Sequence, residues 1–364
     1  MSQPVISASA IPVEKKKFVR RTASDRSQRI RLIVQGLFVA LNLWIGAQFL
    51  LWVGWIERGG AGLAVSRPAG AEGWLPIAGL MNFKLFLLTG QVPAIHPAAM
   101  VLFIAFLLMS LLLKKAFCSW LCPVGTLSEL LWKAGRKMFG RSLHLPRWAD
   151  LPLRSLKYLL LAFFAFIIGS MSAAALTEFL QTPYGLIADV KMLNFFRHLG
   201  LTGAVVLLTL AALSLFIQNF WCRYLCPYGA LMGLVSLLSP MKIRRDREAC
   251  IDCGECARAC PAALPVDRLL QIRSVECTGC MACVSVCATE NALHFALPPR
   301  SFARSSDRWY RRSFGPRTVA ALLALIFFGL ILAAKATGHW QTHLPNALYF
   351  DLVPRADELS HPMR

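Results

Sequence analysis

The sequence predicts an α-helical integral membrane protein of five spans, with a small cysteine-rich α+β module inserted before the last span. Three observations predict this class. The 364-residue chain is 56% hydrophobic with a mean hydropathy of +0.53, values that soluble domains rarely reach. Several stretches of about 20 apolar residues are each long enough to cross the hydrocarbon core of a bilayer. All twelve cysteines fall in tight clusters, eight of them between residues 250 and 287.

Five apolar stretches define the expected spans, which lie at residues 32–56, 97–117, 158–177, 201–221 and 318–336. The stretch 74–88 is also apolar, but Pro, Gly, Asn and Lys interrupt it, so we expect an interfacial or re-entrant segment there. A helix over residues 126–138 has leucines on one side and basic side chains on the other. This pattern predicts a helix lying on the membrane surface.

The remaining segments flank these spans. We expect a basic tail at 1–31, a four-span membrane domain at 32–239, the cysteine-rich module at 240–300, a basic linker at 301–317 and a tail at 337–364. With the N-terminus inside, 31 of the 39 Lys and Arg residues fall on the inner side. The positive-inside rule therefore places the N-terminus and the module in the cytoplasm and the C-terminus in the periplasm. The same bias accounts for the net charge of +20, and no basic segment with interleaved aromatic residues indicates a nucleic-acid partner.

The eight clustered cysteines form two runs of identical spacing. The runs are Cys250-Ile-Asp-Cys253-Gly-Glu-Cys256-Ala-Arg-Ala-Cys260-Pro261 and Cys277-Thr-Gly-Cys280-Met-Ala-Cys283-Val-Ser-Val-Cys287-Ala288. In bacterial ferredoxin segments of this spacing, three cysteines bind one iron–sulfur cluster and the fourth binds the other cluster. The spacing therefore predicts two [4Fe–4S] clusters, whose iron atoms are bound by the cysteine thiolates.

The same rule assigns the ligands. We expect one cluster on Cys250, Cys253, Cys256 and Cys287, and the second on Cys277, Cys280, Cys283 and Cys260. Structural zinc sites usually pair their cysteines two and two, and disulfides are disfavoured in a reducing cytoplasm. Two iron–sulfur clusters therefore explain the spacing of the two runs better than zinc sites or disulfides do. Ala288 stands where the first run has Pro261, but neither residue is a ligand, so the ligand sets are unaffected.

A second motif occurs twice, 104 residues apart. Phe117-Cys118-Ser-Trp-Leu-Cys122-Pro123-Val-Gly125-Thr-Leu127 matches Trp221-Cys222-Arg-Tyr-Leu-Cys226-Pro227-Tyr-Gly229-Ala-Leu231. Each copy follows an expected span that runs from outside to inside, which indicates two related two-span units. Proline disfavours helix at the residue before it and suits the first position of a new helix. We therefore expect Cys122 and Cys226 at a helix break, near the amino end of the helix that follows.

The function of the doubled motif stays open at this point. If the two spans pack together, Cys118, Cys122, Cys222 and Cys226 could form a four-sulfur site for a further metal, cluster or redox reaction close to the module. A structural turn and a docking surface for a partner protein are the alternatives.

Three titratable residues lie near the outer ends of the expected spans. His96 and His198 precede the second and fourth spans, and Glu178 ends the third. They are candidates for a quinone site, in which Glu178 could accept a proton from a quinol; interfacial polar residues are the alternative. Their positions outside the middle of the spans disfavour a haem held by two histidines.

Together, the five spans, the doubled Cys-x3-Cys-Pro and the two-cluster segment resemble the bacterial membrane polyferredoxins over residues 30–337. This family includes NapH-like, NosR-like and YccM-like proteins, and the sequence is closest to the YccM-like branch. NosR-like proteins have a large flavin domain before the first span, where this sequence has a short tail. CcoG-like copper reductases have a folded domain after the last span, where residues 338–364 are too few for one.

The resemblance implies a multi-pass protein of the bacterial inner membrane that passes electrons between the cytoplasmic module and the quinone pool or a redox partner protein. We expect an electron carrier of a respiratory chain, in contact with membrane lipid, rather than a self-contained enzyme. The alternatives are a quinol-linked or cupric reductase in the maturation of respiratory enzymes, and a redox sensor.

Overall fold

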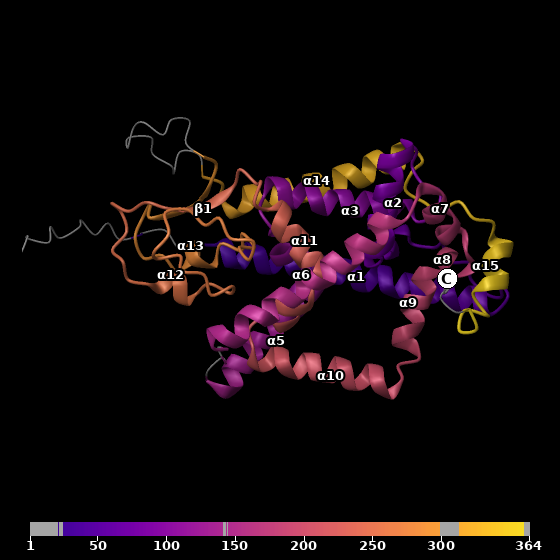
Figure 1. Cartoon of the computed structure of the whole chain (residues 1–364), viewed down its shortest axis with the longest axis horizontal. Helices are drawn as coiled ribbons and strands as arrows, with labels where there is room; N and C mark the ends of the chain where they lie inside the picture. The colour runs from indigo at the N-terminus through magenta and orange to yellow at the C-terminus, as the bar shows by residue number, and fades with distance from the viewer. Residues whose placement is uncertain (1–20, 22–24, 141–142, 144, 299–312, 360–364) are drawn as a thin grey trace, which may run out of the picture.

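The structure is a computed structural model that describes residues 21, 25–140, 143, 145–298 and 313–359. The expected basic tail up to residue 20, the linker residues 301–312 and residues 360–364 lie outside the described residues. The molecule is elongated (Figure 1). The cysteine-rich module lies at one end, called the module end below, and the C-terminal helix α15 lies at the other, called the far end.

Most of the described chain is helical. The membrane domain contains α1 (Ser27–Glu57), η1 (Ala69–Trp74), α2 (Pro76–Thr89), α3 (Pro97–Leu112), α4 (Ala116–Trp120), α5 (Pro123–Phe139), α6 (Arg147–Ser170), α7 (Ala173–Gln181), α8 (Pro183–Leu186), α9 (Ala188–Arg197), α10 (Leu201–Phe216), the π-helical turn η2 (Trp221–Leu225) and α11 (Pro227–Val235). The module contains β1 (Lys242–Arg245), α12 (Glu255–Arg258), α13 (Ala282–Ser285) and β2 (Leu293–Ala296), and α14 (Pro316–Ala336) and α15 (Asn346–Leu352) follow it.

Among the described residues, α1, α6 and α14 are long and apolar enough to cross a membrane. The pair α9 and α10 adds a fourth candidate if a bent pair counts as one span, although the two helices meet at 82°. The expected second span is represented by α3, which has 16 residues because the chain turns at Leu113 and Lys114, whose φ angle is 61°. The structure thus contains three to four candidate spans, and the fifth stays a prediction.

Two other span boundaries differ from the expectation. The expected third span, residues 158–177, lies in α6, which begins and ends earlier, and α7 begins after a break at Ser172. The apolar stretch expected to be interfacial or re-entrant forms α2, which packs against α3. Gly79 permits this close packing, because a methyl group there would lie 2.9 Å from the carbonyl oxygen of Ala99.

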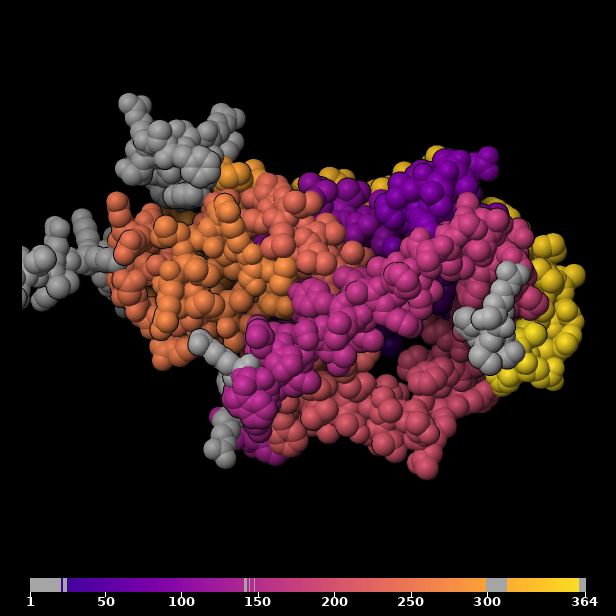
Figure 2. All heavy atoms as spheres, in the orientation of Figure 1, coloured from indigo at the N-terminus to yellow at the C-terminus, as the bar shows by residue number. Residues whose placement is uncertain are grey.

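The helices are not arranged as one regular bundle. In Figure 1, α2, α3 and α14 run along one side of the molecule, and α6 crosses the middle. Helix α10 stands away from them on the opposite side, and Figure 2 shows an opening beside it. It packs on α5, where the rings of Phe139 and Phe216 stack 4.9 Å apart.

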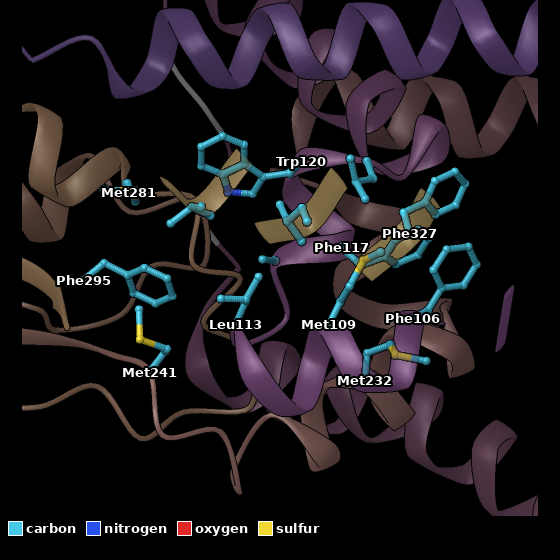
Figure 3. Packing of buried hydrophobic residues seen from close by; sticks show 14 of the residues in the cluster. Phe106, Met109, Leu113, Phe117, Trp120, Met232, Met241, Met281, Phe295 and Phe327 are labelled. Carbon is cyan, nitrogen blue, oxygen red and sulfur yellow. The ribbon is translucent and has the colours of Figure 1, made fainter. Parts of the chain in front are cut away.

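One hydrophobic core passes from the membrane helices into the module (Figure 3). Met109 of α3 and Trp120 of α4 lie on the helical side, and Met281 and Phe295 on the module side. Within the module, β1 and β2 pair antiparallel, from Lys242 opposite Ala296 to Arg245 opposite Leu293. The module is therefore packed against the ends of the helices, which fixes the position of its cysteines relative to them.

Candidate functional site

The two cysteine runs adopt the same backbone conformation. Asp252 and Gly254 flank the second cysteine of the first run with φ angles of 56° and 73°. Gly279 and Met281 occupy the equivalent positions of the second run, with 61° and 58°. A left-handed conformation costs a residue with a side chain roughly 1–2 kcal/mol, so local propensity alone does not favour it at Asp252 and Met281. The identical spacing thus corresponds to one turn geometry used twice.

The structure groups the eight cysteines across the two runs. Cys287 of the second run lies within electrostatic range of Cys250 and Cys253 of the first, and Cys256 is within range of Cys250 and Cys287. A separate small cavity is lined together by Cys260, Cys277, Cys280 and Cys283. Cysteines of the two runs thus lie close to one another, as the expected ligand sets require, and Cys283 is also within electrostatic range of Cys256. The division into two ligand sets stays a prediction.

The two groups differ in their exposure to solvent. Cys253 of the first group is exposed, whereas Cys277, Cys280 and Cys283 of the second are buried. Burial raises the pKa of the Cys260 thiol to about 12, so loss of its proton is less favourable than for an exposed thiol. A metal that binds it as a thiolate must displace this proton.

How closely the cysteine side chains approach one another decides whether they fit a single metal ion or a cluster. Among the described residues, no three His, Cys, Asp or Glu side chains approach closely enough to hold a single metal ion. A cubane cluster spreads its ligands, because each cysteine binds a different iron atom. Two groups of four widely spaced thiols therefore fit iron–sulfur clusters in both donor type and donor number.

The doubled motif makes the same turn in both copies. Cys122 is the N-cap of α5 and Cys226 is the N-cap of α11, and a proline follows each. The Sγ atoms accept backbone hydrogen bonds from Gly125 at 3.4 Å and Gly229 at 3.2 Å. These contacts confirm the predicted helix break. A methyl group on Gly125 would lie 2.3 Å from the carbonyl oxygen of Cys118, so the first copy requires glycine there.

All four cysteines of the doubled motif line one cavity of about 780 Å³, and they are Cys118, Cys122, Cys222 and Cys226. From the module side, Cys280, Thr278 and Pro261 also line this cavity. Since these same three residues line the small cavity of the second cysteine group, they form a wall between the two. The larger cavity is called the membrane cavity below. Beyond the cysteines it is mainly apolar and is lined by α1, α3 and α14.

Buried cations surround the cysteine end of the membrane cavity. Arg31 lies 2.6 Å from Glu129 and donates a hydrogen bond to the carbonyl oxygen of Ser119 at 3.2 Å. Lys115 is 4% exposed and lies within electrostatic range of three of the four motif cysteines. Its ammonium has no hydrogen bond or ion pair to any residue that the structure describes. No sequence pattern indicates this role, because Lys115 follows an apolar stretch, where a basic residue usually marks the end of a span.

The three candidate quinone residues have different surroundings. His96 is buried, with Nδ1 3.3 Å from Glu72 Oε1 and Nε2 2.9 Å from the carbonyl oxygen of Gly185. His198 is mostly exposed and lies 3.3 Å from Asp357, and Glu178 is exposed on α7. None of the three lines the membrane cavity.

His96 belongs to a buried charge cluster that sequence reasoning missed. Arg67 lies 2.9 Å from Glu72 and 2.6 Å from Asp189. Burial opposes ionisation of Glu72, but its contact with His96 and the charge of Arg67 outweigh this and lower its pKa to about 2. Burial also opposes the charging of His96, and Glu72 outweighs it and raises the pKa of the imidazole. Asp189 lies 122 positions from Arg67 and the cluster follows no motif, so no sequence pattern predicts that these residues meet.

Comparison with known proteins identifies the same segments. Residues 95–142 and 199–246, each containing one copy of the doubled motif, match the family described as "4Fe-4S binding domain", and residues 242–288 match the "4Fe-4S dicluster domain". The chain is 52% identical over 337 residues to the "Putative electron transport protein YccM" of Escherichia coli (strain K12), and the match covers 91% of each chain.

Two further relatives match less of the chain. The "Ferredoxin-type protein NapH" of Escherichia coli (strain K12) is 28% identical over 49% of this chain and 60% of its own. The "Regulatory protein NosR" of Pseudomonas aeruginosa is 30% identical over 58% of this chain and 29% of its own. No solved structure matches the chain.

Proposed function

The chain belongs to the bacterial membrane polyferredoxin family, and from this premise we propose that it carries electrons between a two-cluster module on the cytoplasmic side of the inner membrane and a lipophilic carrier in the membrane. The candidate spans and the names of the relatives support a membrane protein with an iron–sulfur electron-transfer role.

The module holds two [4Fe–4S] clusters, one on Cys250, Cys253, Cys256 and Cys287 and the other on Cys277, Cys280, Cys283 and Cys260. The grouping of these thiols across the two runs supports the assignment. When bound, each cluster supplies a carrier for one electron at a time. The exposed Cys253 makes the first group the side on which a cytoplasmic redox protein docks.

The single observation that carries this function is the wall between the two cavities. Cys280 lines both the cavity of the second cysteine group and the membrane cavity. The carbonyl oxygens of Thr278 and Gly279 are fixed against α4 by hydrogen bonds from Ser119 Oγ at 2.8 Å and Trp120 Nε1 at 3.2 Å. The chain thereby holds its inner ligand group directly against the membrane domain.

The four cysteines of the doubled motif form a third redox site on the other side of this wall. Four thiols on one cavity are the donor set of an iron–sulfur centre. The "4Fe-4S binding domain" match, which covers each copy of the motif, supports the assignment.

The apolar part of the membrane cavity is the site of the membrane carrier. On α1 it is lined from Arg31 to Ile45, which are roughly 20 Å apart along a straight helix. At the opposite end from the cysteines, Trp74 Nε1 donates a hydrogen bond to Asn42 at 3.1 Å. A long apolar cavity fits a quinone, which takes two electrons and two protons to become a quinol. A periplasmic redox protein is the alternative partner.

The experiment measures reduction of a short-chain quinone by the dithionite-reduced protein, purified without oxygen in detergent. Ile331 lines the membrane cavity, so Ile331→Trp should slow the reaction about tenfold, the effect of roughly 1.4 kcal/mol of lost binding. Leu325→Trp is the matched control, because Leu325 lies on the same helix and is 68% exposed.

Three results are decisive. The function is supported if wild-type protein shows the electron paramagnetic resonance (EPR) signals of [4Fe–4S] clusters and if Ile331→Trp, but not Leu325→Trp, slows quinone reduction. Equal rates in the two tryptophan variants contradict the quinone site. Wild-type protein without iron–sulfur signals contradicts the whole function.

A further inference from the structure

Four lysines are buried where the module meets the membrane domain: Lys114, Lys115, Lys157 and Lys242. Three of them have partners in the chain. Lys114 donates to the carbonyl oxygen of Ser274 at 2.9 Å, Lys157 lies 2.6 Å from Glu276, and Lys242 donates to the carbonyl oxygen of Leu237 at 2.8 Å. Within the described residues, Lys115 has no such partner.

A buried ammonium without a partner is costly, since taking a charge out of water costs several kcal/mol that only a counter-charge or hydrogen bonds recover. The nearby carboxylate of Glu276 is engaged by Lys157. The ammonium of Lys115 instead lines the membrane cavity beside the amino end of α11, where a methyl group on Gly229 would lie 3.6 Å from its Nζ. The position calls for an anion in the cavity.

The surrounding thiols identify the class of this anion. Cys118, Cys222 and Cys226 all lie within electrostatic range of Lys115. Four thiolates on an iron–sulfur core carry a net negative charge, and reduction adds one more. Among the described residues, neither these four thiols nor the module cysteines form a group that could hold a single metal ion, and the module cysteines lie in the dicluster match.

We propose that Lys115 is the counter-charge of an anionic iron–sulfur centre held by Cys118, Cys122, Cys222 and Cys226, and that it raises the reduction potential of this centre. The inference rests on the third redox site of the proposed function. A fixed positive charge stabilises the reduced form, which has the extra negative charge, more than the oxidised form. In each transfer the module loses one electron and the four-cysteine site gains it, while Lys115 keeps its proton.

The test is a redox titration followed by EPR, with iron and sulfide counts, on the full chain purified in detergent without oxygen. Lys115→Met should shift the midpoint potential of the additional centre to lower values and leave the module signals in place. Lys115→Arg, which keeps the charge, should restore the wild-type value. Lys335→Met is the matched control, because Lys335 also lines the membrane cavity but lies on α14, toward the far end.

The outcomes separate the two proposals. Wild-type protein with iron for only two clusters, and no additional signal, removes the four-cysteine centre itself. If the additional centre is present and Lys115→Met leaves its potential unchanged, the role of Lys115 is wrong while the centre stands. If Lys115→Met abolishes the centre, retention in Lys115→Arg supports the counter-charge, and loss in both variants overturns it.

Discussion

Both ends of the molecule bury charged side chains, but they balance the charge in different ways. At the far end, Arg67 lies between Glu72 and Asp189, and His96 lies beside Glu72, so each charge has a partner in the chain. At the module end, the ammonium of Lys115 has none among the described residues. Charges that the chain itself balances hold segments together, whereas the unbalanced charge of Lys115, within electrostatic range of three thiols, is the basis of the proposed anionic centre.

The contacts of the far-end cluster agree with a structural role. Thr342 donates a hydrogen bond to Glu72 at 2.8 Å and accepts one from the backbone N–H of His96 at 3.1 Å. Next to it, the rings of Trp52 and Tyr349 meet edge to face at 5.1 Å. The cluster thus joins α1, η1, α9 and the chain after α14, which no local contact would bring together.

The largest expected difference in stability is between variants that replace the central cation of each end, Arg67 and Lys115. Arg67→Met leaves two buried carboxylates without their main partner and should destabilise the protein by about 3–5 kcal/mol. In cofactor-free protein, Lys115→Met removes an unpaired buried charge and should leave stability unchanged or raise it. Thermal unfolding in detergent, followed by circular dichroism, measures both. Equal losses in the two variants would show that the ends do not differ in this way.

The next largest expected effect is a difference in stability between equivalent glycine variants in the two copies of the doubled motif, both at the module end. Gly125→Ala would bring a methyl group within 2.3 Å of the Cys118 carbonyl oxygen and should cost about 2–3 kcal/mol through a forced backbone shift. At Gly229 the nearest atom would be Cys226 Sγ at an ordinary 3.5 Å, so Gly229→Ala should change stability by less than about 1 kcal/mol. The same unfolding assay compares them. A loss in Gly229→Ala as large as that in Gly125→Ala would contradict the packing.

The same contrast explains what sequence reasoning could predict. The helix break at Cys122 and Cys226 depends on the proline that follows each cysteine, so a short stretch of sequence is enough to predict it. The far-end cluster depends on Arg67 meeting Asp189, 122 positions away, which no periodicity encodes. The shortened α3 has a similar cause, because the turn at Lys114 is held by a hydrogen bond from its backbone N–H to Ser239 Oγ at 3.0 Å. Lys115 looked like the basic end of a span, and only the folded arrangement places it among the thiols.

A smaller effect follows from the titration of the far-end cluster. The pKa of Glu72 is lowered to about 2 from 4.5, so its stabilising contribution is present above pH 4.5 and is lost as the pH falls toward 2. The pKa of His96 is raised from 6.5, so its contribution is fully present below pH 6.5 and is lost as the pH rises through the raised value. The unfolding temperature should therefore be highest between about pH 4.5 and 6.5 and should fall on the alkaline side.

His96→Gln should abolish this alkaline fall, because glutamine keeps a polar side chain that does not titrate. His198→Gln is the matched control, since His198 is 58% exposed and should not affect the profile. An alkaline fall that persists in His96→Gln would mean that the cluster is not balanced by the imidazolium. With Arg67 as the only cation against Glu72 and Asp189, the far end would then have an unbalanced buried charge too, and it would have to be examined as a second ligand site.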